Sequence, residues 1–203
     1  VATYQAVAAS TKYQKLKEAQ MRLFHRPRPN RFADSRDNIH HHYDIGNEFY
    51  ELWLDREAMQ YTCAYFPSPD LTIEQAQRAK MDHVCRKLQL KPGDRVVEAG
   101  SGWGGFARHM ARHYGARVRS YNISHQQVLY ARERARADGL GNNLEYVEDD
   151  YRHITGEYDV FVSIGMLEHV GRDNYRELGD VIHRCLAPDG LGLLCLRWLR
   201  RRG

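Results

Sequence analysis

The chain has 203 residues, of which 42% are hydrophobic and 28% are charged, and this suits one folded domain with an appendage. No apolar run approaches the roughly 20 residues that span a bilayer, and no signal peptide is visible, which argues against an integral membrane protein. The four cysteines are far apart and form no C-x-x-C pair, so a zinc or disulfide framework is not expected and a reducing cytosol is favoured.

The net charge of +4 is mild, but the basic residues are unevenly placed. One arginine cluster lies early in the chain and a second lies at its end. The clusters consist of Arg22, Arg26, Arg28, Arg31 and Arg36, and of Arg197, Arg200, Arg201 and Arg202. Such clusters fit anionic lipid headgroups or nucleic acid, and they also fit a surface that only improves solubility.

The first part of the chain predicts a helical lid or docking segment. Residues Ala2–Phe24 spread apolar side chains among Gln, Lys and Glu, as a surface helix does, and the two prolines of Arg26–Asn30 interrupt this pattern. We therefore predict an N-terminal segment over residues 1–38 and a second domain over residues 39–203.

Three elements are expected at the start of the second domain. Asn47–Leu54 reads as a short helix with Phe49, Tyr50, Leu52 and Trp53 mostly buried. Residues Met59–Phe66 alternate between apolar and polar until Pro67–Pro69 ends the pattern, and a longer helix follows over Thr72–Leu90.

From Arg95 onward, predicted strands and helices alternate. Strands are predicted at Arg95–Ala99, Arg117–Asn122, Leu144–Val147, Tyr158–Ile164 and Gly192–Leu196. Helices are predicted at Phe106–Tyr114, His125–Asp138 and Asn174–Leu186. This alternation predicts an α/β fold, with a parallel sheet covered by helices on both faces. Ligands of such sheets bind outside the carboxyl ends of the strands, so the loops after Ala99, Asn122, Glu148 and Ile164 are expected to line one site.

Residues Gly100–Gly105, here called the glycine turn, connect the first of these strands to a helix. Their spacing also satisfies G-x-G-x-x-G, which binds a dinucleotide when a carboxylate follows about 20 residues later. Residues 121–123 are Tyr, Asn and Ile, so that carboxylate is missing. An acid before the turn, Glu98, suits an α-amino group, and Asp149 and Asp150 suit an adenine edge. Both groups occur in S-adenosylmethionine, which is favoured over a dinucleotide.

Several stretches of the chain together resemble the cyclopropane-fatty-acid and mycolic acid cyclopropane synthases, which are S-adenosylmethionine-dependent methyltransferases. The matching stretches are His42–Asn47, Met59–Phe66, Gln89–Gly93, Gly100–Gly105, Asp150–Arg152 and Gly165–Gly171. The Cys-Ala-Tyr and Glu-His-Val-Gly elements are more specific than a glycine-rich turn. The resemblance implies a Rossmann-like class I methyltransferase fold.

The resemblance also implies roles for individual residues. Tyr61 and Thr62 lie along the methionine part of the donor, and Glu98, Gly100, Ser101, Gly102 and Gly104 hold its amino-acid end. Asn122, Ile123 and Gln127 take the ribose and neighbouring atoms, while Asp150 and Tyr151 take the adenine. Cys63, Ile164, Glu168 and Cys195 belong to the reaction centre, where a bicarbonate ion held partly by the Glu168-type carboxylate acts as the base.

The implied reaction is transfer of a methyl or methylene group to the double bond of an unsaturated phospholipid acyl chain. The expected location is therefore the cytoplasm, in peripheral contact with the inner face of the membrane, without nucleic acid and with a homodimer as a candidate assembly. Two alternatives stay open: a small-molecule N-methyltransferase, and a non-catalytic remnant that binds only the donor or a membrane.

The chain departs from the family pattern at three places. Ser101 replaces a cysteine of the glycine turn, which we expect to be harmless. Cys195 replaces a histidine that helps to hold bicarbonate, and the family continues with further strands where this chain ends in an Arg-rich stretch. We therefore expect a C-terminally truncated or frame-shifted core that binds the donor but turns over very slowly. No metal site is expected, because the consecutive histidines 40–42 cannot all face one ion.

Overall fold

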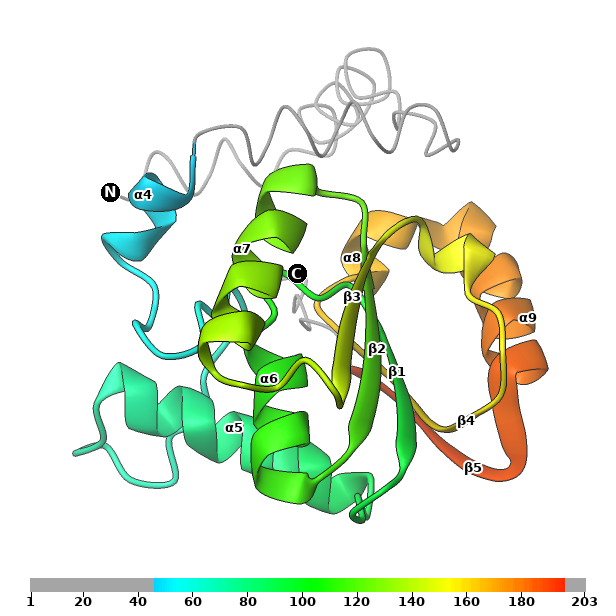
Figure 1. Cartoon of the computed structure of the whole chain (residues 1–203), viewed down its shortest axis with the longest axis horizontal. Coiled ribbons are helices and arrows are strands. Elements are labelled where there is room, and N and C mark those ends of the chain that lie inside the picture. Colours follow the sequence, from blue (N-terminus) through cyan, green and yellow to red (C-terminus); the bar gives the residue numbers. More distant parts are fainter. Residues whose placement is uncertain (1–45, 196–203) are drawn as a thin grey trace, which may run out of the picture. The chain divides into compact units, whose positions relative to one another are not determined.

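The computed structural model describes residues 46–195. Within this range the helices, including two short 3-10 helices labelled η, alternate with five strands (Figure 1). In chain order the elements are α4 (Asn47–Glu51), α5 (Ile73–Lys87), β1 (Arg95–Ala99), α6 (Gly105–Tyr114), β2 (Arg117–Asn122), α7 (His125–Ala137), β3 (Leu144–Glu148), η1 (Tyr151–His153), β4 (Tyr158–Ile164), α8 (Leu167–Val170), η2 (Arg172–Asn174), α9 (Tyr175–Cys185) and β5 (Leu186–Cys195).

The five strands form one parallel sheet in the order β3-β2-β1-β4-β5. Val96 of β1 pairs with Val118 of β2 on one side and with Val160 of β4 on the other. Because every pair is parallel, the carboxyl ends of all five strands lie along one edge of the sheet. This carboxyl edge is where the loops predicted to line a site come together.

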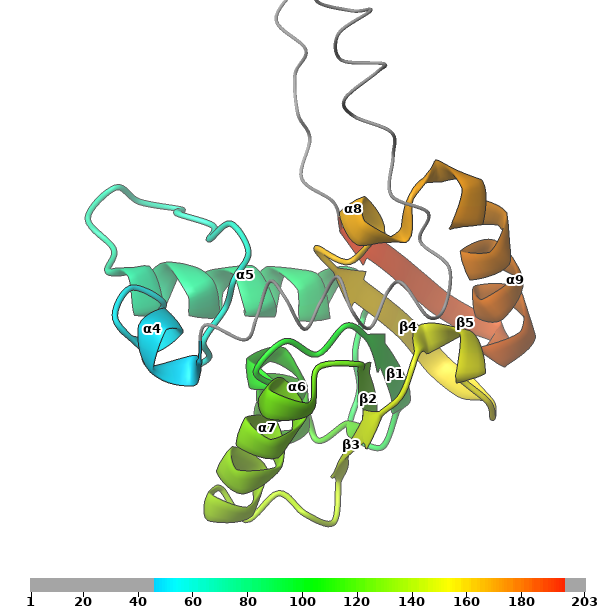
Figure 2. The ribbon, with the colours of Figure 1, turned by 90° about the horizontal axis from the view of Figure 1, so that it is seen from above.

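Two hydrophobic clusters cover the two faces of the sheet. Adjacent residues of a strand point to opposite faces, so Val96 packs in the cluster with α5, α6 and α7, whereas Val97 packs in the cluster with α9. Figure 2 shows α6 and α7 on one side of the sheet and α9 on the other. Burial on both faces explains why β1 and β4 read as nearly continuous apolar runs.

Local sequence explains where the main helices begin and end. Thr72 accepts a hydrogen bond from the Gln75 backbone N–H at 3.3 Å, and the Gln75 side chain accepts one from the Thr72 backbone N–H at 2.9 Å. This capping box fixes the start of α5. Helix α6 starts after Gly104 and ends at Gly115, both with left-handed backbone angles that favour glycine.

The predicted alternation and fold class are confirmed, with two local corrections. The burial predicted around α4 is wrong for three of four residues: Tyr50 is buried, but Phe49, Leu52 and Trp53 are exposed. The fifth strand starts at Leu186 and not at Gly192. Its pairing with β4 is irregular, so that Tyr158 pairs with Leu186 and Val160 already pairs with Leu191.

Other predictions fall outside the described residues. The N-terminal helix, the boundary after residue 38, both arginine clusters and the histidines 40–42 all lie in the undescribed parts of the chain. Among residues 46–195, no helix is long and apolar enough to cross a membrane.

Candidate donor site at the carboxyl edge of the sheet

The glycine turn lies at the centre of the carboxyl edge and is tied to its neighbours by backbone contacts. The backbone N–H groups of Gly100 and Ser101 both donate to the carbonyl of Tyr121, at 2.9 and 3.1 Å. Ser163 donates its hydroxyl to the carbonyl of Ala99 at 2.8 Å, which links the ends of β1 and β4. The turn is therefore fixed between β2 and β4, at the place where the strand order changes direction.

The second half of the glycine turn packs closely against other elements. A Cβ atom at Gly104 would lie 2.5 Å from the Tyr146 hydroxyl and 2.6 Å from the Ala131 Cβ. The Tyr146 hydroxyl donates to the Gly104 carbonyl at 2.6 Å. Gly104 is therefore required by space as well as by its backbone angle.

Glu98 is a buried carboxylate directly before the turn. Only 3% of its surface is exposed, and the Ser120 hydroxyl donates a hydrogen bond to the carboxylate at 2.5 Å. Burial raises the pKa of Glu98 to about 7, and the Ser120 hydrogen bond and the Lys80 charge lower it by less. A cation bound beside this carboxylate would stabilise its charged form, as expected of a group that receives an α-ammonium.

Ser101, Asn122 and Gln127 form a polar lining beside the turn. The Asn122 amide donates to the Gly102 carbonyl at 3.1 Å and to the Gln127 side chain at 2.8 Å. The Ser101 hydroxyl donates to the Gly102 carbonyl at 3.1 Å. Gln127 is buried and Ile123 is half-buried. The predicted ribose-binding residues thus lie together at the end of β2.

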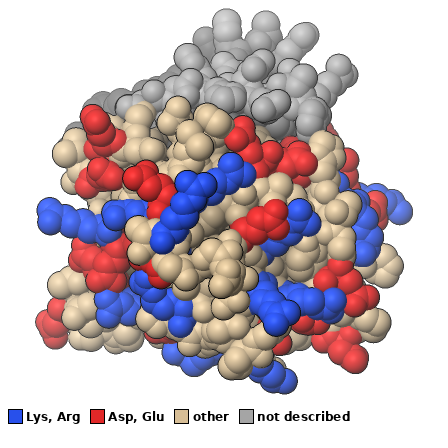
Figure 3. Space-filling view, in the orientation of Figure 1, with Lys and Arg blue, Asp and Glu red and all other residues tan. Residues whose placement is uncertain are grey.

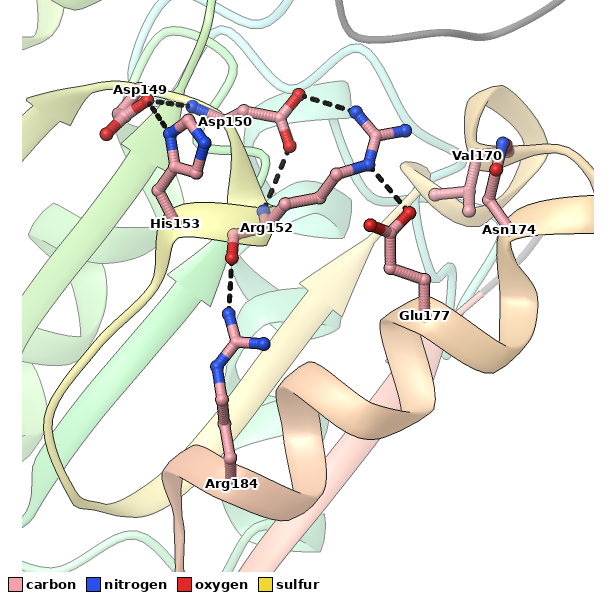
Figure 4. A network of polar contacts seen from close by, with 8 residues as sticks. All are labelled: Asp149, Asp150, Arg152, His153, Val170, Asn174, Glu177 and Arg184. Carbon is pink, nitrogen blue, oxygen red and sulfur yellow. Dashed lines mark hydrogen bonds and ion pairs between the residues drawn. The ribbon is translucent and has the colours of Figure 1, made fainter.

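Asp150 lies in an ionic network after the end of β3 (Figure 4), and Tyr151 follows it as the first residue of η1. The Asp150 carboxylate accepts from the Arg152 backbone N–H at 2.9 Å and pairs with the Arg152 guanidinium at 3.1 Å. Arg152 also pairs with Glu177 of α9 at 2.9 Å, and its guanidinium lies 5.1 Å from the centre of the Tyr151 ring. Asp150 is therefore already paired within the protein, whereas the buried Tyr151 hydroxyl has no hydrogen-bond partner among the described residues.

The Gln60–Cys63 segment contains Tyr61, Thr62 and Cys63. It meets the carboxyl edge of the sheet at the loop after β4. Thr62 lies beside the loop after β4, because a Cβ atom at Gly165 would be 2.7 Å from the Thr62 methyl group. Tyr61 is exposed, and its ring contacts those of Tyr50 and Trp53. Cys63 is exposed.

Three residues that hold this segment were not predicted from the sequence. The buried Asp55 carboxylate accepts from the backbone N–H groups of Ala58 and Gln60, both at 2.7 Å. Gln77 and Lys80 of α5 donate to Gln60 and Thr62. On a helix such polar residues normally face water, so only their three-residue spacing, which places them on one face, could have indicated a shared role.

The predicted reaction-centre residues lie at the ends of β4 and β5. Ile164 is half-buried at the end of β4, and Glu168 is exposed in the first turn of α8. Cys195 pairs with Ile164 in the sheet, and its carbonyl accepts from the Gly165 backbone N–H at 2.9 Å. The thiol of Cys195 is exposed.

Two further features of the described residues bear on the kind of site. No group of three or more His, Cys, Asp or Glu side chains in this part of the chain is arranged to hold a metal ion. A cavity of about 250 Å³ is lined by Arg78, Arg108 and Arg112 among others, but it includes none of the residues predicted for the donor or the reaction centre.

Comparison with known proteins gives a consistent family. The family model described as mycolic acid cyclopropane synthetase matches residues 31–199. A probable fatty acid methyltransferase of Pseudomonas putida is 48% identical over 138 residues, which are 67% of this chain and 35% of that protein. The cyclopropane-fatty-acyl-phospholipid synthase of Escherichia coli strain K12 is 44% identical over 153 residues, which are 75% of this chain and 38% of that protein.

A solved structure shares the fold. The crystal structure of the mycolic acid cyclopropane synthase CmaA1 complexed with SAH and CTAB matches with a TM-score of 0.75 and 31% identity, over 78% of this chain and 55% of that chain. This chain thus has the fold of class I S-adenosylmethionine-dependent methyltransferases, and it spans about a third of the length of the two relatives named above. Since the family model covers most of its residues, the chain belongs to the mycolic acid cyclopropane synthetase family.

Proposed function

We propose that the chain binds S-adenosylmethionine and takes part in transfer of a methyl or methylene group to the double bond of an unsaturated phospholipid acyl chain. The product is a cyclopropane or a methyl-branched chain. The observation that carries the proposal is the convergence of Glu98, the glycine turn and Thr62 at one edge of the sheet, in a chain of this family.

The residues at this edge fit the donor. The left-handed angles of Gly100 and Gly102 keep side chains away from a bound ligand, and nothing lies within 4 Å of a Cβ atom built at Gly102. Glu98 supplies a negative charge for the α-ammonium group of the donor. When bound, the donor supplies a methyl group on a positively charged sulfur.

The acceptor sets two demands on the protein. An alkene is a weak nucleophile, so the transfer requires a pocket that excludes water. Methylation leaves a carbocation, which an aromatic face stabilises, and Tyr65 is a candidate for this role. The Tyr65 ring is half-exposed and stacks on His83, with ring centres 5.1 Å apart.

Ring closure then requires a base that removes a proton from the new methyl group. By family resemblance the base is bicarbonate, with Glu168, Cys63, Ile164 and Cys195 around it. Glu168 and the thiols of Cys63 and Cys195 are exposed in the described part of the chain, so the residues present do not enclose an anion. Cys195 is also a poor replacement for a histidine, because a neutral thiol is a weak donor.

The location and the assembly of the chain complete the proposal. A phospholipid acyl chain lies in a bilayer, so the proposed location is the cytoplasm, in peripheral contact with the membrane. A homodimer is the proposed assembly.

Lipid analysis tests the proposal. Membrane lipids of cells that express the chain are analysed by mass spectrometry, with a full-length relative as the positive control. Gain of one CH₂ per acyl chain, lost in Glu168→Gln and kept in the exposed control Asp180→Asn, supports the proposed reaction. Donor binding without any lipid product identifies a chain that only binds the donor, and methylation of amines instead of lipid identifies an N-methyltransferase.

A further inference from the structure

Lys80 of α5 is a buried cation with two close partners in the Gln60–Cys63 segment. Its ammonium donates to the Gln60 side-chain oxygen at 2.8 Å and to the Thr62 hydroxyl at 2.7 Å. Only 8% of the Lys80 surface is exposed. Burying an ammonium group is costly unless its hydrogen bonds are made, so these two contacts are required for Lys80 to lie where it does.

Gln77, one helical turn before Lys80, contacts the same two residues. Its side-chain amide donates to the Gln60 carbonyl at 3.3 Å and to the Thr62 carbonyl at 2.9 Å. Helix α5 thus holds both the backbone and the side chains of the segment. Gln77 fixes the backbone, and Lys80 fixes the two side chains.

Thr62 also contacts the loop after β4, which lies at the donor site. Its methyl group fills the space over Gly165, where a Cβ atom would be only 2.7 Å away. Gly165 in turn donates to the Cys195 carbonyl, at the end of β5. Holding Thr62 therefore holds the contact between the Gln60–Cys63 segment and the loop after β4.

The charge of Lys80 is sensitive to its surroundings. Burial lowers the pKa of Lys80 to about 8, and the nearby Asp55, Cys195, Cys63 and Glu98 act in the opposite direction by less. These four groups come from the loop after α4, from β5, from the Gln60–Cys63 segment and from β1. A neutral amine still forms hydrogen bonds, but weaker ones than an ammonium does.

We propose that Lys80 is a positioning residue of the donor site, whose positive charge fixes Gln60 and Thr62 so that the Gln60–Cys63 segment closes against the loop after β4. The inference rests on the proposed donor site. It adds that the contact between the Gln60–Cys63 segment and the loop after β4 depends on the protonation of Lys80, which is not among the residues assigned to the donor.

Calorimetric titration of the whole chain with S-adenosylhomocysteine tests the inference. We expect Lys80→Met to weaken binding about tenfold, because a charge-assisted hydrogen bond is lost. The exposed Lys87→Met on the same helix should bind as the wild type does. Thr62→Val should reproduce part of the loss, because it removes one of the two hydrogen bonds that Lys80→Met removes. Combining the two substitutions should therefore add little to the loss in Lys80→Met.

A pH series separates positioning from mere structural support. Wild-type affinity should fall as the pH rises through about 8, where Lys80 loses its proton, and Lys80→Met should lack this fall. Thermal unfolding confirms that the variant is folded, since methionine fills the buried space without the cost of a charge.

The outcomes are distinct. Equal affinity and equal pH profiles of wild type and Lys80→Met overturn the role of Lys80 and leave the donor site standing. Absence of binding by the wild type at every pH overturns the donor site itself, and with it the role of Lys80.

Discussion

At the scale of single residues, Glu98 shows a conflict between stability and binding. Its carboxylate is buried and accepts a hydrogen bond from Ser120, and such a charge is costly in an apolar surrounding. A protein under selection for stability alone would place an apolar residue here. A carboxylate at this position is explained by a positively charged ligand that offsets the cost.

Replacing this carboxylate should change how stability depends on pH. Burial raises the pKa of Glu98 to about 7, whereas in the unfolded chain it is about 4.3. The free energy of unfolding of the wild type therefore includes the full contribution of protonated Glu98 below pH ~4.3. This contribution, on the order of 3 kcal/mol, is lost as the pH rises through 7. Glu98→Gln resembles the protonated form, so it should match the wild type at low pH, be more stable at pH 8, and no longer bind S-adenosylhomocysteine.

Urea unfolding at pH 5 and pH 8 measures this effect. The exposed Glu133→Gln on α7 is the control and should leave the difference between the two pH values unchanged. Parallel stability curves for wild type and Glu98→Gln would show that Glu98 is charged at no cost in the folded protein.

At the scale of elements, the glycine turn is part of the core as well as of the donor site. Gly104 is in contact distance of β3 and α7, and a Cβ atom at Gly105 would lie 2.0 Å from the Ala58 carbonyl. Strand β3, the glycine turn and the loop after α4 are therefore packed as one unit. Movement of the turn requires movement of all three.

Two alanine substitutions separate backbone strain from packing in this turn. Gly102 and Gly104 both have left-handed angles, but only Gly104 has neighbours within 4 Å of a new Cβ atom. Gly102→Ala should cost about 1–2 kcal/mol for its backbone angle alone. Gly104→Ala should cost a further 1–3 kcal/mol, roughly, from overpacking against Tyr146 and Ala131. Thermal unfolding measures both, and equal losses would contradict the packing argument.

The elements also show how far the sequence predicts this fold. The bounds of β1 and β4 follow from mainly apolar runs, those of β2 follow from its position between two helical patterns, and the glycine turn and Glu98 are visible as a motif. The start of β5 is hidden, because Pro188, Asp189 and Gly190 are typical of a turn although the strand runs through them.

The hydrogen bonds that fix the Gln60–Cys63 segment could not be predicted from the sequence either. Asp55, Gln77 and Lys80 are polar residues of a type usually exposed, and their burial depends on hydrogen bonds to residues up to 20 positions away in the sequence. In the same way the exposure of Phe49, Leu52 and Trp53 could not be read from their apolar character. Sequence patterns report the face of an element but not what lies opposite it.

At the scale of the whole molecule, positive and negative charges are mixed on one face of the described residues. Figure 3 shows Lys and Arg interspersed with Asp and Glu on the visible face. A mixed surface attracts an anionic bilayer only weakly. The proposed contact with a membrane therefore depends on the arginine cluster from Arg22 to Arg36, outside the described residues.

Sedimentation with lipid vesicles tests this dependence. The whole chain should bind vesicles of anionic phospholipid more than neutral ones, by up to ~1 kcal/mol for each well-placed arginine, and the difference should shrink as salt is added. Changing Arg22, Arg26 and Arg28 to Gln should remove most of it, while changing the exposed Arg86, Arg117 and Arg136 should not. Equal sedimentation with both vesicle types at low salt would contradict the prediction.

The aromatic cluster beside the glycine turn provides an optical signal. Two of the three tryptophans, Trp53 and Trp103, lie with Tyr50 and Tyr61 in this cluster, and the Tyr50 and Trp103 ring centres are 4.7 Å apart. The Trp103 indole N–H donates to the Asn47 side chain at 2.8 Å, which connects α4 to the turn. Emission from Trp103 reports a buried position within the turn, and emission from Trp53 reports a half-exposed one next to Tyr61. Ligand entry can therefore be followed by intrinsic fluorescence without a label, and combining Trp53→Phe with Trp198→Phe leaves Trp103 as the remaining tryptophan and assigns the signal to it.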